Sequence, residues 1–307
     1  MSSYSSISAV QKCHRSRILR SAMKGCNSLS DAFIFGTAYH ESIEHKDVNK
    51  GISVLNKHGL ESQIPLLEEM YNRFIIFIAK LGIEILENEV SFNLSLEEGE
   101  YEGKIDAILR WNGDIYLGEF KTAKYISTEH IDADAQITSY LWACDKLGIY
   151  NPKGLIWIGN KKSKEKEPTI LKNGHLSTAK NQGVSYNKYM SKAIEIYGDD
   201  IPESILSFMQ WLKVNDNPSI AMVVTKRTNH QKNNCEKTIK KLMKIEKEIM
   251  DNYKEKGIVK ALEDCITLPD KMCMQTCPYK DLCGSLYSGE GITDEDVKIY
   301  IDGLREE

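Results

Sequence analysis

Alternating hydrophobic and polar residues predict a β-hairpin over residues 101–124. Its two strands flank Asn112-Gly113, a dipeptide that tolerates the positive φ angles of a two-residue turn. Counting back from this turn along both strands places Asp106 opposite Glu119. Residues two apart share a face of a strand, so Lys121 points the same way as Glu119. A register shift of one residue would send the two carboxylates to opposite faces.

The opposed carboxylates have two possible interpretations, a solvated surface and a functional site. Antiparallel sheets often have one solvated face, and charged hairpin residues usually belong to it. Ile108 and Leu117, however, share the face of Asp106 and Glu119 in this register, and a fully solvated face should not carry them. Directly opposed like charges destabilise a sheet. A divalent cation bound by both carboxylates would remove that cost, so the pattern favours a metal site.

The remaining periodicity predicts an α/β core with a mixed sheet. A strand at Glu89–Leu96 precedes the hairpin, and the apolar run Gly154–Gly159 is typical of a buried strand. The order of helix, three strands, helix and strand is that of an α/β fold, and the charged segment 161–168 predicts a solvated loop. Helices are expected within 4–24, from Asp31 onward, and over 60–86, 128–147, 182–197, 203–212 and 229–256.

The composition is that of an ordinary globular protein and does not indicate a binding partner. The 307 residues are 41% hydrophobic and 27% charged, as in ordinary globular proteins. No apolar run is long enough to span a bilayer, and the N-terminus lacks the layout of a secretory signal. We therefore expect an intracellular, cytoplasmic protein without a membrane partner. The formal net charge of −4 does not by itself indicate nucleic acid, although metal-binding carboxylates contribute to it.

Four of the eight cysteines lie within nineteen residues near the C-terminus. Intracellular thiols stay reduced, so metal or cluster ligation is the usual reason for such a group. The candidates are a four-thiolate Zn²⁺ site and an iron–sulfur cluster. The spacings of seven, three and five intervening residues differ from the short paired knuckles of a zinc ribbon, which makes zinc the second choice. The four cysteines are Cys265, Cys273, Cys277 and Cys283.

Other candidates have an ordinary structural reading when each is taken alone. His40 shares a helix face with Glu44 and could be a core or surface histidine. Cys13 has apolar neighbours, which is typical of a buried structural thiol. The lysines of the 229–256 helix favour a solvated face over one that tracks phosphates.

Several short motifs nevertheless follow one another along nearly the whole chain. They are Cys13 in a basic helix, Gly36 to Glu41 including His40, Gly103-Lys104-Ile105-Asp106, Glu119-Phe120-Lys121, Gln136 with Tyr140, and the cysteine group ending in Cys277-Pro278-Tyr279-Lys280-Asp281-Leu282-Cys283. In this order they resemble the RecB-like branch of the PD-(D/E)XK nucleases that carry an iron–sulfur cluster. CRISPR-associated RecB-like exonucleases and many phage exonucleases belong to that branch.

The resemblance implies a single nuclease domain over residues 1–307 with a restriction-endonuclease-like core at about 31–160. A helical C-terminal region at about 180–307 would close onto the N-terminal helix through the cluster. The implied activity is metal-dependent hydrolysis of DNA by a bacterial or phage-encoded enzyme, most simply an exonuclease. The implied catalytic residues are Asp106, Glu119 and Lys121, with Mg²⁺ or Mn²⁺ bound by His40, Asp106, Glu119 and the Phe120 carbonyl, and with Gln136, Tyr140 and Arg227 supporting the site or contacting DNA.

The resemblance also changes the expected cluster ligands. In the family one N-terminal and three C-terminal cysteines hold a [4Fe-4S] cluster, which implies Cys13, Cys273, Cys277 and Cys283 here. The residues alone would have selected Cys265 in place of Cys13. Two departures from the family pattern are Ile105 before Asp106, where proline is usual, and the three residues between Cys273 and Cys277, where two are commoner.

Three alternatives remain open at this point. A nuclease fold without catalysis could serve as a DNA-binding module, although the intact Asp106, Glu119 and Lys121 set argues against it. A nuclease of CRISPR adaptation, acting in an integrase complex, would share every motif. An iron–sulfur redox protein would leave the opposed carboxylates unexplained. A homo-oligomer, or a recombination or replication protein as partner, is compatible with the nuclease readings.

Overall fold

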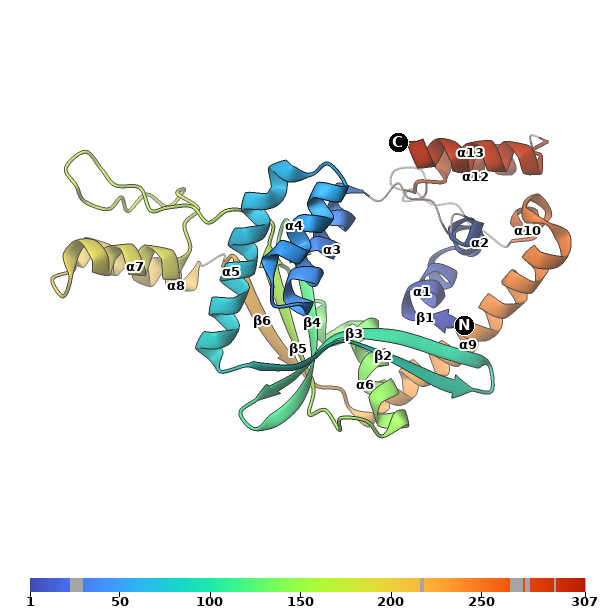
Figure 1. Ribbon diagram of the computed structural model, residues 1–307, viewed down its shortest axis with the longest axis horizontal. Helices are drawn as coiled ribbons and strands as arrows, with labels where there is room; N and C mark the ends of the chain where they lie inside the picture. Colours follow the sequence, from blue (N-terminus) through green and yellow to red (C-terminus); the bar gives the residue numbers. More distant parts are fainter. Residues whose placement is uncertain (23–29, 216–217, 266–272, 274–276, 290, 307) are drawn as a thin grey trace.

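A mixed six-stranded sheet forms the centre of the protein (Figure 1). The hydrophobic pattern predicted the mixed sheet and four of its strands, and missed β1 and β6. The computed structural model describes residues 1–22, 30–215, 218–265, 273, 277–289 and 291–306. The strand order is β1-β3-β4-β5-β6, and β2 pairs with β3. β4 and β5 are parallel, as are β1 and β3, and the other pairs are antiparallel. The strands are β1 (Ser2–Ser3), β2 (Glu84–Leu96), β3 (Gly99–Trp111), β4 (Asp114–Ala123), β5 (Leu155–Lys161) and β6 (Ile220–Thr225).

Helices cover both faces of this sheet and extend beyond it on two sides (Figure 1). The N-terminal half holds α1 (Tyr4–Lys12), α2 (His14–Ala22), α3 (Asp31–Glu44), α4 (Val48–Lys57), α5 (Ile64–Leu81) and α6 (Ala135–Leu147). The C-terminal half holds α7 (Tyr186–Tyr197), α8 (Glu203–Val214), α9 (Asn229–Lys256), α10 (Ile258–Asp264), α12 (Lys280–Ser288) and α13 (Asp294–Glu306).

Two apolar layers bury the sheet, one on each face. Side chains of α3, α4 and α5 pack on strand residues such as Leu109, Phe120 and Ile156. Side chains of α1, α6 and α9 pack on the opposite face, against residues that include Leu117 and Trp157. β5 is buried along nearly its whole length, which explains its continuous apolar run. The layers leave the sheet open where β4 and β5 end.

The hairpin follows the expected register. Asn112 and Gly113 have φ angles of 50° and 82°, as a two-residue turn of this type requires. Trp111 pairs with Asp114, and the ladder continues to Ala107 and Gly118. Beyond that pair the strands part, because β3 continues beside β2 and β4 continues beside β5.

Some predicted boundaries were wrong for local reasons. The expected helix over 60–86 ends at Leu81, because Gly82 takes the left-handed conformation (φ 65°) that terminates helices, and β2 then begins at Glu84. The N-terminal helix is two helices, divided at Cys13, whose backbone is extended. α6 begins at Ala135, capped by Asp134, later than expected. No helix among the described residues is long and apolar enough to cross a membrane.

Candidate active site

Asp106 and Glu119 lie where β3 and β4 part. They are the next residues beyond the last pair of the ladder, Ala107 and Gly118. The Oδ2 atom of Asp106 accepts a hydrogen bond from the backbone N–H of Phe120 at 2.7 Å. The β4 backbone therefore fixes the Asp106 carboxylate next to the strand that carries Glu119.

His40 reaches the same place from α3, which packs on the sheet. Its Nδ1 atom lies 3.8 Å from Asp106 Oδ1 and 3.6 Å from Glu89 Oε1. Each of these three residues offers one ligand atom, and the three atoms lie within 4.8 Å of one another. An imidazole nitrogen and two carboxylate oxygens at this spacing could share one metal ion.

Glu89 is the one member of this group that no sequence motif indicated. It lies in β2 between the pairs Asn88–Ala107 and Val90–Ile105, which places it beside Asp106. Its φ angle of 53° is uncommon for a residue without a left-handed preference. Lys104 makes an ion pair with Glu89, so it does not lie opposite Lys121 as a continued ladder would require. The only sequence signal was an acidic residue at the start of a predicted strand.

Glu119 is almost fully buried, with 2% of its surface exposed. Lys121 makes an ion pair with its Oε1 atom. Its Oε2 atom is buried and has no hydrogen-bond partner among the described residues. Burial and the charge of Asp106 raise the pKa of Glu119 to about 7, although Lys121 opposes the shift. The carboxylate therefore lacks part of the compensation that its charged form needs.

Burial and the same nearby charges also shift the pKa values of the neighbouring groups. Burial raises the pKa of Asp106, although the charges of His40 and Lys121 oppose the shift. Burial acts to lower the pKa of His40, but the hydrogen bond with Glu89 and the charge of Asp106 outweigh it and raise the pKa. Burial also acts to lower the pKa of Lys121, and Glu119 and Asp106 reverse that effect. The pKa shifts of these groups therefore reflect their burial together with the charges that they exert on one another.

Gln136 and Tyr140 flank these residues from α6. The Gln136 side-chain N–H donates to the Tyr140 hydroxyl at 2.8 Å. Gln136 lines a cavity of about 310 Å³ together with Glu119 and Lys121. It also lines a neighbouring cavity of about 680 Å³ with Tyr140 and Lys104. The structure therefore brings this predicted pair to the site, at the boundary between two hollows.

Arg227 does not lie where a phosphate contact needs it. Its side chain is buried, and its guanidinium donates to the Thr138 hydroxyl at 2.7 Å and to the Ile131 carbonyl at 2.6 Å. It also donates to the Thr225 hydroxyl at 2.6 Å. These bonds join β6 to the segment before α6, so Arg227 is a structural residue and the expected contact with DNA was wrong.

Three cysteines of the C-terminal group lie in an apolar cluster where the two ends of the chain meet. Cys265, Cys277 and Cys283 pack on one apolar cluster that contains Ile18 of α2. Burial raises the pKa of Cys265 to about 11, although the charge of Arg15 opposes the shift. No three cysteine sulfur atoms of the described residues lie within 4.8 Å of one another. Residues 266–272 and 274–276 of the predicted group lie outside the described residues.

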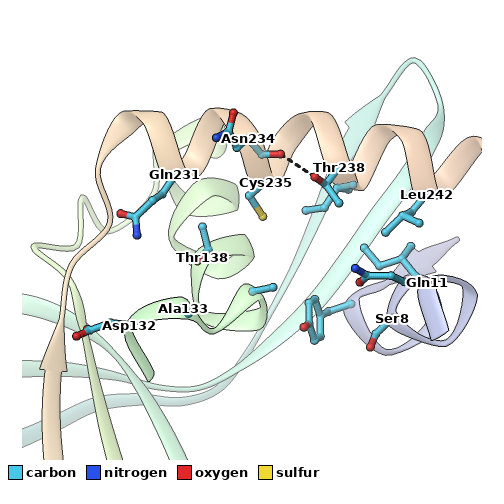
Figure 2. Close-up of a pocket in the computed structure, with 14 residues that line it drawn as sticks. Ser8, Gln11, Asp132, Ala133, Thr138, Gln231, Asn234, Cys235, Thr238 and Leu242 are labelled. Carbon is cyan, nitrogen blue, oxygen red and sulfur yellow. Dashed lines mark hydrogen bonds between the residues drawn. The ribbon is translucent and has the colours of Figure 1, made fainter. Parts of the chain in front are cut away.

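A separate cavity of about 280 Å³ lies between α1, α6 and α9 (Figure 2). Cys235 faces it, and burial raises the pKa of that thiol to about 11. Among its described lining residues, Asp132 is the single carboxylate, and its Oδ1 atom accepts a hydrogen bond from Thr225 at 2.7 Å. This cavity brings together no set of groups comparable to that around Asp106.

Comparisons with known proteins leave the chain without a family. No family model matches it, and no curated protein is similar to it. Among solved structures, "Crystal structure of SSO0001" is similar at 14% sequence identity, over 47% of this chain and 70% of that chain, with a TM-score of 0.23. A likeness this small shows neither a shared fold nor a shared function.

Proposed function

We propose that this protein is a metal-dependent DNA nuclease of the RecB-like PD-(D/E)XK type. The observation that carries the proposal is the convergence of His40, Asp106, Glu119 and Lys121 where β3 and β4 part. His40 comes from α3, which is far in sequence from the hairpin that supplies the other three residues. A solvated hairpin face, the ordinary alternative, would not bury Glu119 or bring a histidine against Asp106.

The donor groups fit a divalent metal ion. His40, Glu89 and Asp106 have ligand atoms within 4.8 Å of one another, and Glu119 has a buried oxygen without a partner among the described residues. Carboxylates suit Mg²⁺ and Mn²⁺, and an imidazole favours the transition metal. A bound cation would favour the ionised form of both Asp106 and Glu119. The Phe120 carbonyl is a further candidate ligand.

When bound, such an ion lowers the pKa of a coordinated water and neutralises charge on phosphoryl oxygens. The residues of the chain supply positioning and a second positive charge. The Phe120 N–H holds Asp106 in place, and Glu89 holds His40. Lys121 has an ammonium beside Glu119 and can stabilise negative charge that develops on phosphate oxygens. Gln136 lines the cavity in which the scissile phosphate would lie, and its hydrogen bond to Tyr140 holds it there.

The decisive experiment compares Glu119→Gln and Lys121→Ala with wild type on labelled single- and double-stranded DNA in Mn²⁺. Each variant should lose roughly 100-fold or more in cleavage rate, the order expected when a transition-state charge partner is removed. Lys153→Ala is the matched control, because Lys153 pairs with Asp114 at the other end of β4. Wild-type rates in both active-site variants would contradict the proposal.

We further propose that a [4Fe-4S] cluster is held by Cys13, Cys273, Cys277 and Cys283. Soft thiolate ligands suit iron–sulfur clusters, and their thiols must lose protons when the cluster binds. The charge of Cys13 acts on the pKa of Cys283, which supports their proximity across the two ends of the chain. Zn²⁺ is the alternative occupant, and Cys265 is the alternative ligand.

A further inference from the structure

A lysine-rich groove continues from the candidate active site over the ends of β4 and β5. It has a volume of about 400 Å³ and is bordered by the segment between β5 and α7 and by α8. Tyr125 lines both this groove and the cavity that contains Glu119 and Lys121. The two hollows are therefore neighbours that share a wall. The lysines that line the groove are Lys124, Lys161, Lys162, Lys164, Lys166 and Lys180.

The fold explains why the groove lies there. β4 and β5 are parallel, with Lys121 beside Gly159 and Ala123 beside Lys161. Both strands therefore end at the same edge of the sheet, where open α/β sheets commonly bind ligands. Lys124 follows Lys121 by three residues, about 10 Å along an extended chain.

Most of these lysines are not neutralised by the protein. In the part of the chain that the structure describes, Lys124, Lys164, Lys166 and Lys180 form no ion pair with a carboxylate. Lysines elsewhere on the surface, such as Lys256 and Lys260, pair with acidic neighbours. Glu165 is the one acidic residue among the described lining residues. A groove with this excess of positive charge suits a polyanion.

Aromatic rings accompany the lysines. Tyr125 is 70% exposed, and the Lys124 ammonium lies 5.6 Å from its ring centroid. Trp211 of α8 stacks on Phe208 and has the Lys180 ammonium 5.2 Å from its ring centroid. Lysines that contact phosphates and rings that stack on bases are the usual components of a single-strand binding surface. Bases of a duplex have their faces covered by their neighbours, so these rings favour an unpaired strand.

One wall of the groove is fixed to the core. Arg73 of α5 donates to the carbonyls of Lys161, Ser163 and Ser219 at 3.2, 3.0 and 3.3 Å. Glu69, one turn earlier, accepts from the backbone N–H of Glu165 at 2.7 Å. The chain that leaves β5 and the residue that precedes β6 are thus both held to α5, which reduces the ordering that a ligand would otherwise have to impose.

We propose that this groove binds the backbone of single-stranded DNA and leads it to the site at Glu119. Lys124, Lys164, Lys166 and Lys180 would contact phosphates, and Tyr125 would stack on a base at the boundary between groove and active site. The inference rests on the proposed nuclease function for its direction, but the binding itself requires no cleavage.

The test measures binding of a labelled single-stranded oligonucleotide in EDTA, so that no hydrolysis occurs. The variant Lys164→Ala/Lys166→Ala/Lys180→Ala should bind at least tenfold more weakly, and the slope of log affinity against log salt should fall by about 2. The control Lys254→Ala/Lys256→Ala/Lys260→Ala removes the same charge from paired lysines at the opposite end of the molecule (Figure 1). It should bind within twofold of wild type.

A second pair of variants tests the aromatic residue. Tyr125→Ala should weaken binding about fivefold or more, and Tyr125→Phe should restore it, because stacking needs the ring and not the hydroxyl. Equal binding by the groove and control variants would overturn the inference, as would a duplex that binds the groove as tightly as the single strand. If wild-type protein does not cleave DNA but binds it through the groove lysines, the nuclease function is contradicted. The groove would then still be assigned to binding of single-stranded DNA.

Discussion

Lys121 compensates the negative charge of the buried Glu119 carboxylate only in part. Its Oε1 atom pairs with Lys121, while Oε2 is buried without a partner among the described residues. Leaving a buried carboxylate oxygen unpaired is costly, and a pKa of about 7 expresses that cost. A cation bound beside Oε2 would supply the partner that this oxygen lacks.

Glu89 should matter although it belongs to no motif. Glu89→Ala removes the hydrogen-bond partner of His40 and one of three converging ligand atoms. We expect Mn²⁺ affinity, measured by calorimetry, to fall about 10- to 100-fold, the range seen when ligand support is lost. Glu87→Ala, an exposed position two residues earlier, should bind as wild type. Unchanged affinity in Glu89→Ala would exclude it from the site.

The difference between Glu89 and Asp106 shows what the sequence can reveal at this scale. The register that places Asp106 near Glu119 follows from local turn chemistry at Asn112-Gly113. Glu89 reaches His40 only because β2 pairs with β3 and because its own backbone has a positive φ angle. The positive φ angle has no signature in the residues around it. The burial of Arg227 likewise depends on β6, a strand that the hydrophobic pattern did not predict.

Among the elements, the position of α3 decides where His40 lies. α4 packs closely against α3 at Gly51, where a Cβ atom would lie 2.2 Å from the Ala38 carbonyl oxygen and 2.1 Å from Ser42 Oγ. Backbone cannot yield to such a contact as a flexible side chain can. The packing therefore requires a residue without a side chain.

Gly51→Ala should accordingly destabilise the protein by about 1–3 kcal/mol, the usual cost of overpacking. Thermal unfolding measures the loss. Gly36→Ala on α3 is the matched control, because nothing lies within 4 Å of its added Cβ. It should be neutral or slightly stabilising, since alanine favours helix. Similar melting temperatures for both variants would contradict this account of the α3–α4 contact.

Glu236 links α9 to α6 and gives the pair a pH dependence. It accepts hydrogen bonds from Trp142 at 3.1 Å and makes ion pairs with Lys146 and Lys240 at 2.9 and 3.0 Å. Burial acts to raise the pKa of Glu236, but these partners outweigh it and lower the pKa to about 2. A carboxylate with a lowered folded-state pKa stabilises the fold above its ordinary value of 4.5, and that contribution is lost as the pH falls toward 2.

Glu236→Gln should therefore cost about 1–2 kcal/mol of stability at pH 7, and the difference from wild type should shrink between pH 4.5 and pH 2. Unfolding in denaturant at several pH values measures it. Glu248→Gln, at an exposed position on the same helix, should show little difference at any pH. A constant deficit for Glu236→Gln across the range would show that its role is packing rather than charge.

Element types were more predictable than element limits. The bounds of α9 and the start of α3 follow from capping residues and apolar periodicity, as expected. The end of α5 was misplaced because the apolar run continues through Gly82 into β2, so hydrophobicity alone could not show the change of period. Short β6 gave too few residues for a pattern.

At the scale of the whole molecule, the two ends of the chain form one unit beside the sheet (Figure 1). Arg17 donates to Glu246 at 2.6 Å, and Arg15 donates to the Leu262 carbonyl at 2.9 Å. Leu19 of α2 shares an apolar cluster with Val297 and Ile301 of α13. These contacts join α2 to α9, α10 and α13 without any metal. A cluster would therefore reinforce an existing contact.

The proposed cluster ligands can be tested by iron content and by substitution of single cysteines. Anaerobically purified protein should be brown, with about four iron and four sulfide per chain. Cys13→Ser should lose most of the iron and lower the melting temperature, because Cys13 sits at the break between α1 and α2, whereas Cys265→Ser should keep the cluster. Cys235→Ser, at a thiol in the separate cavity, is the control and should match wild type. Circular dichroism checks that each variant folds.

The iron content of these variants distinguishes the two possible sets of cluster ligands, one with Cys13 and one with Cys265. Iron loss in Cys265→Ser with retention in Cys13→Ser would assign all four thiolates to the C-terminal segment, and the cluster would then not join the ends of the chain. Colourless protein with one tightly bound zinc would exclude the cluster. Since α2 is already held by Arg15 and Arg17, the Cys13 variant should stay folded. Loss of iron without loss of fold would then identify Cys13 as a ligand.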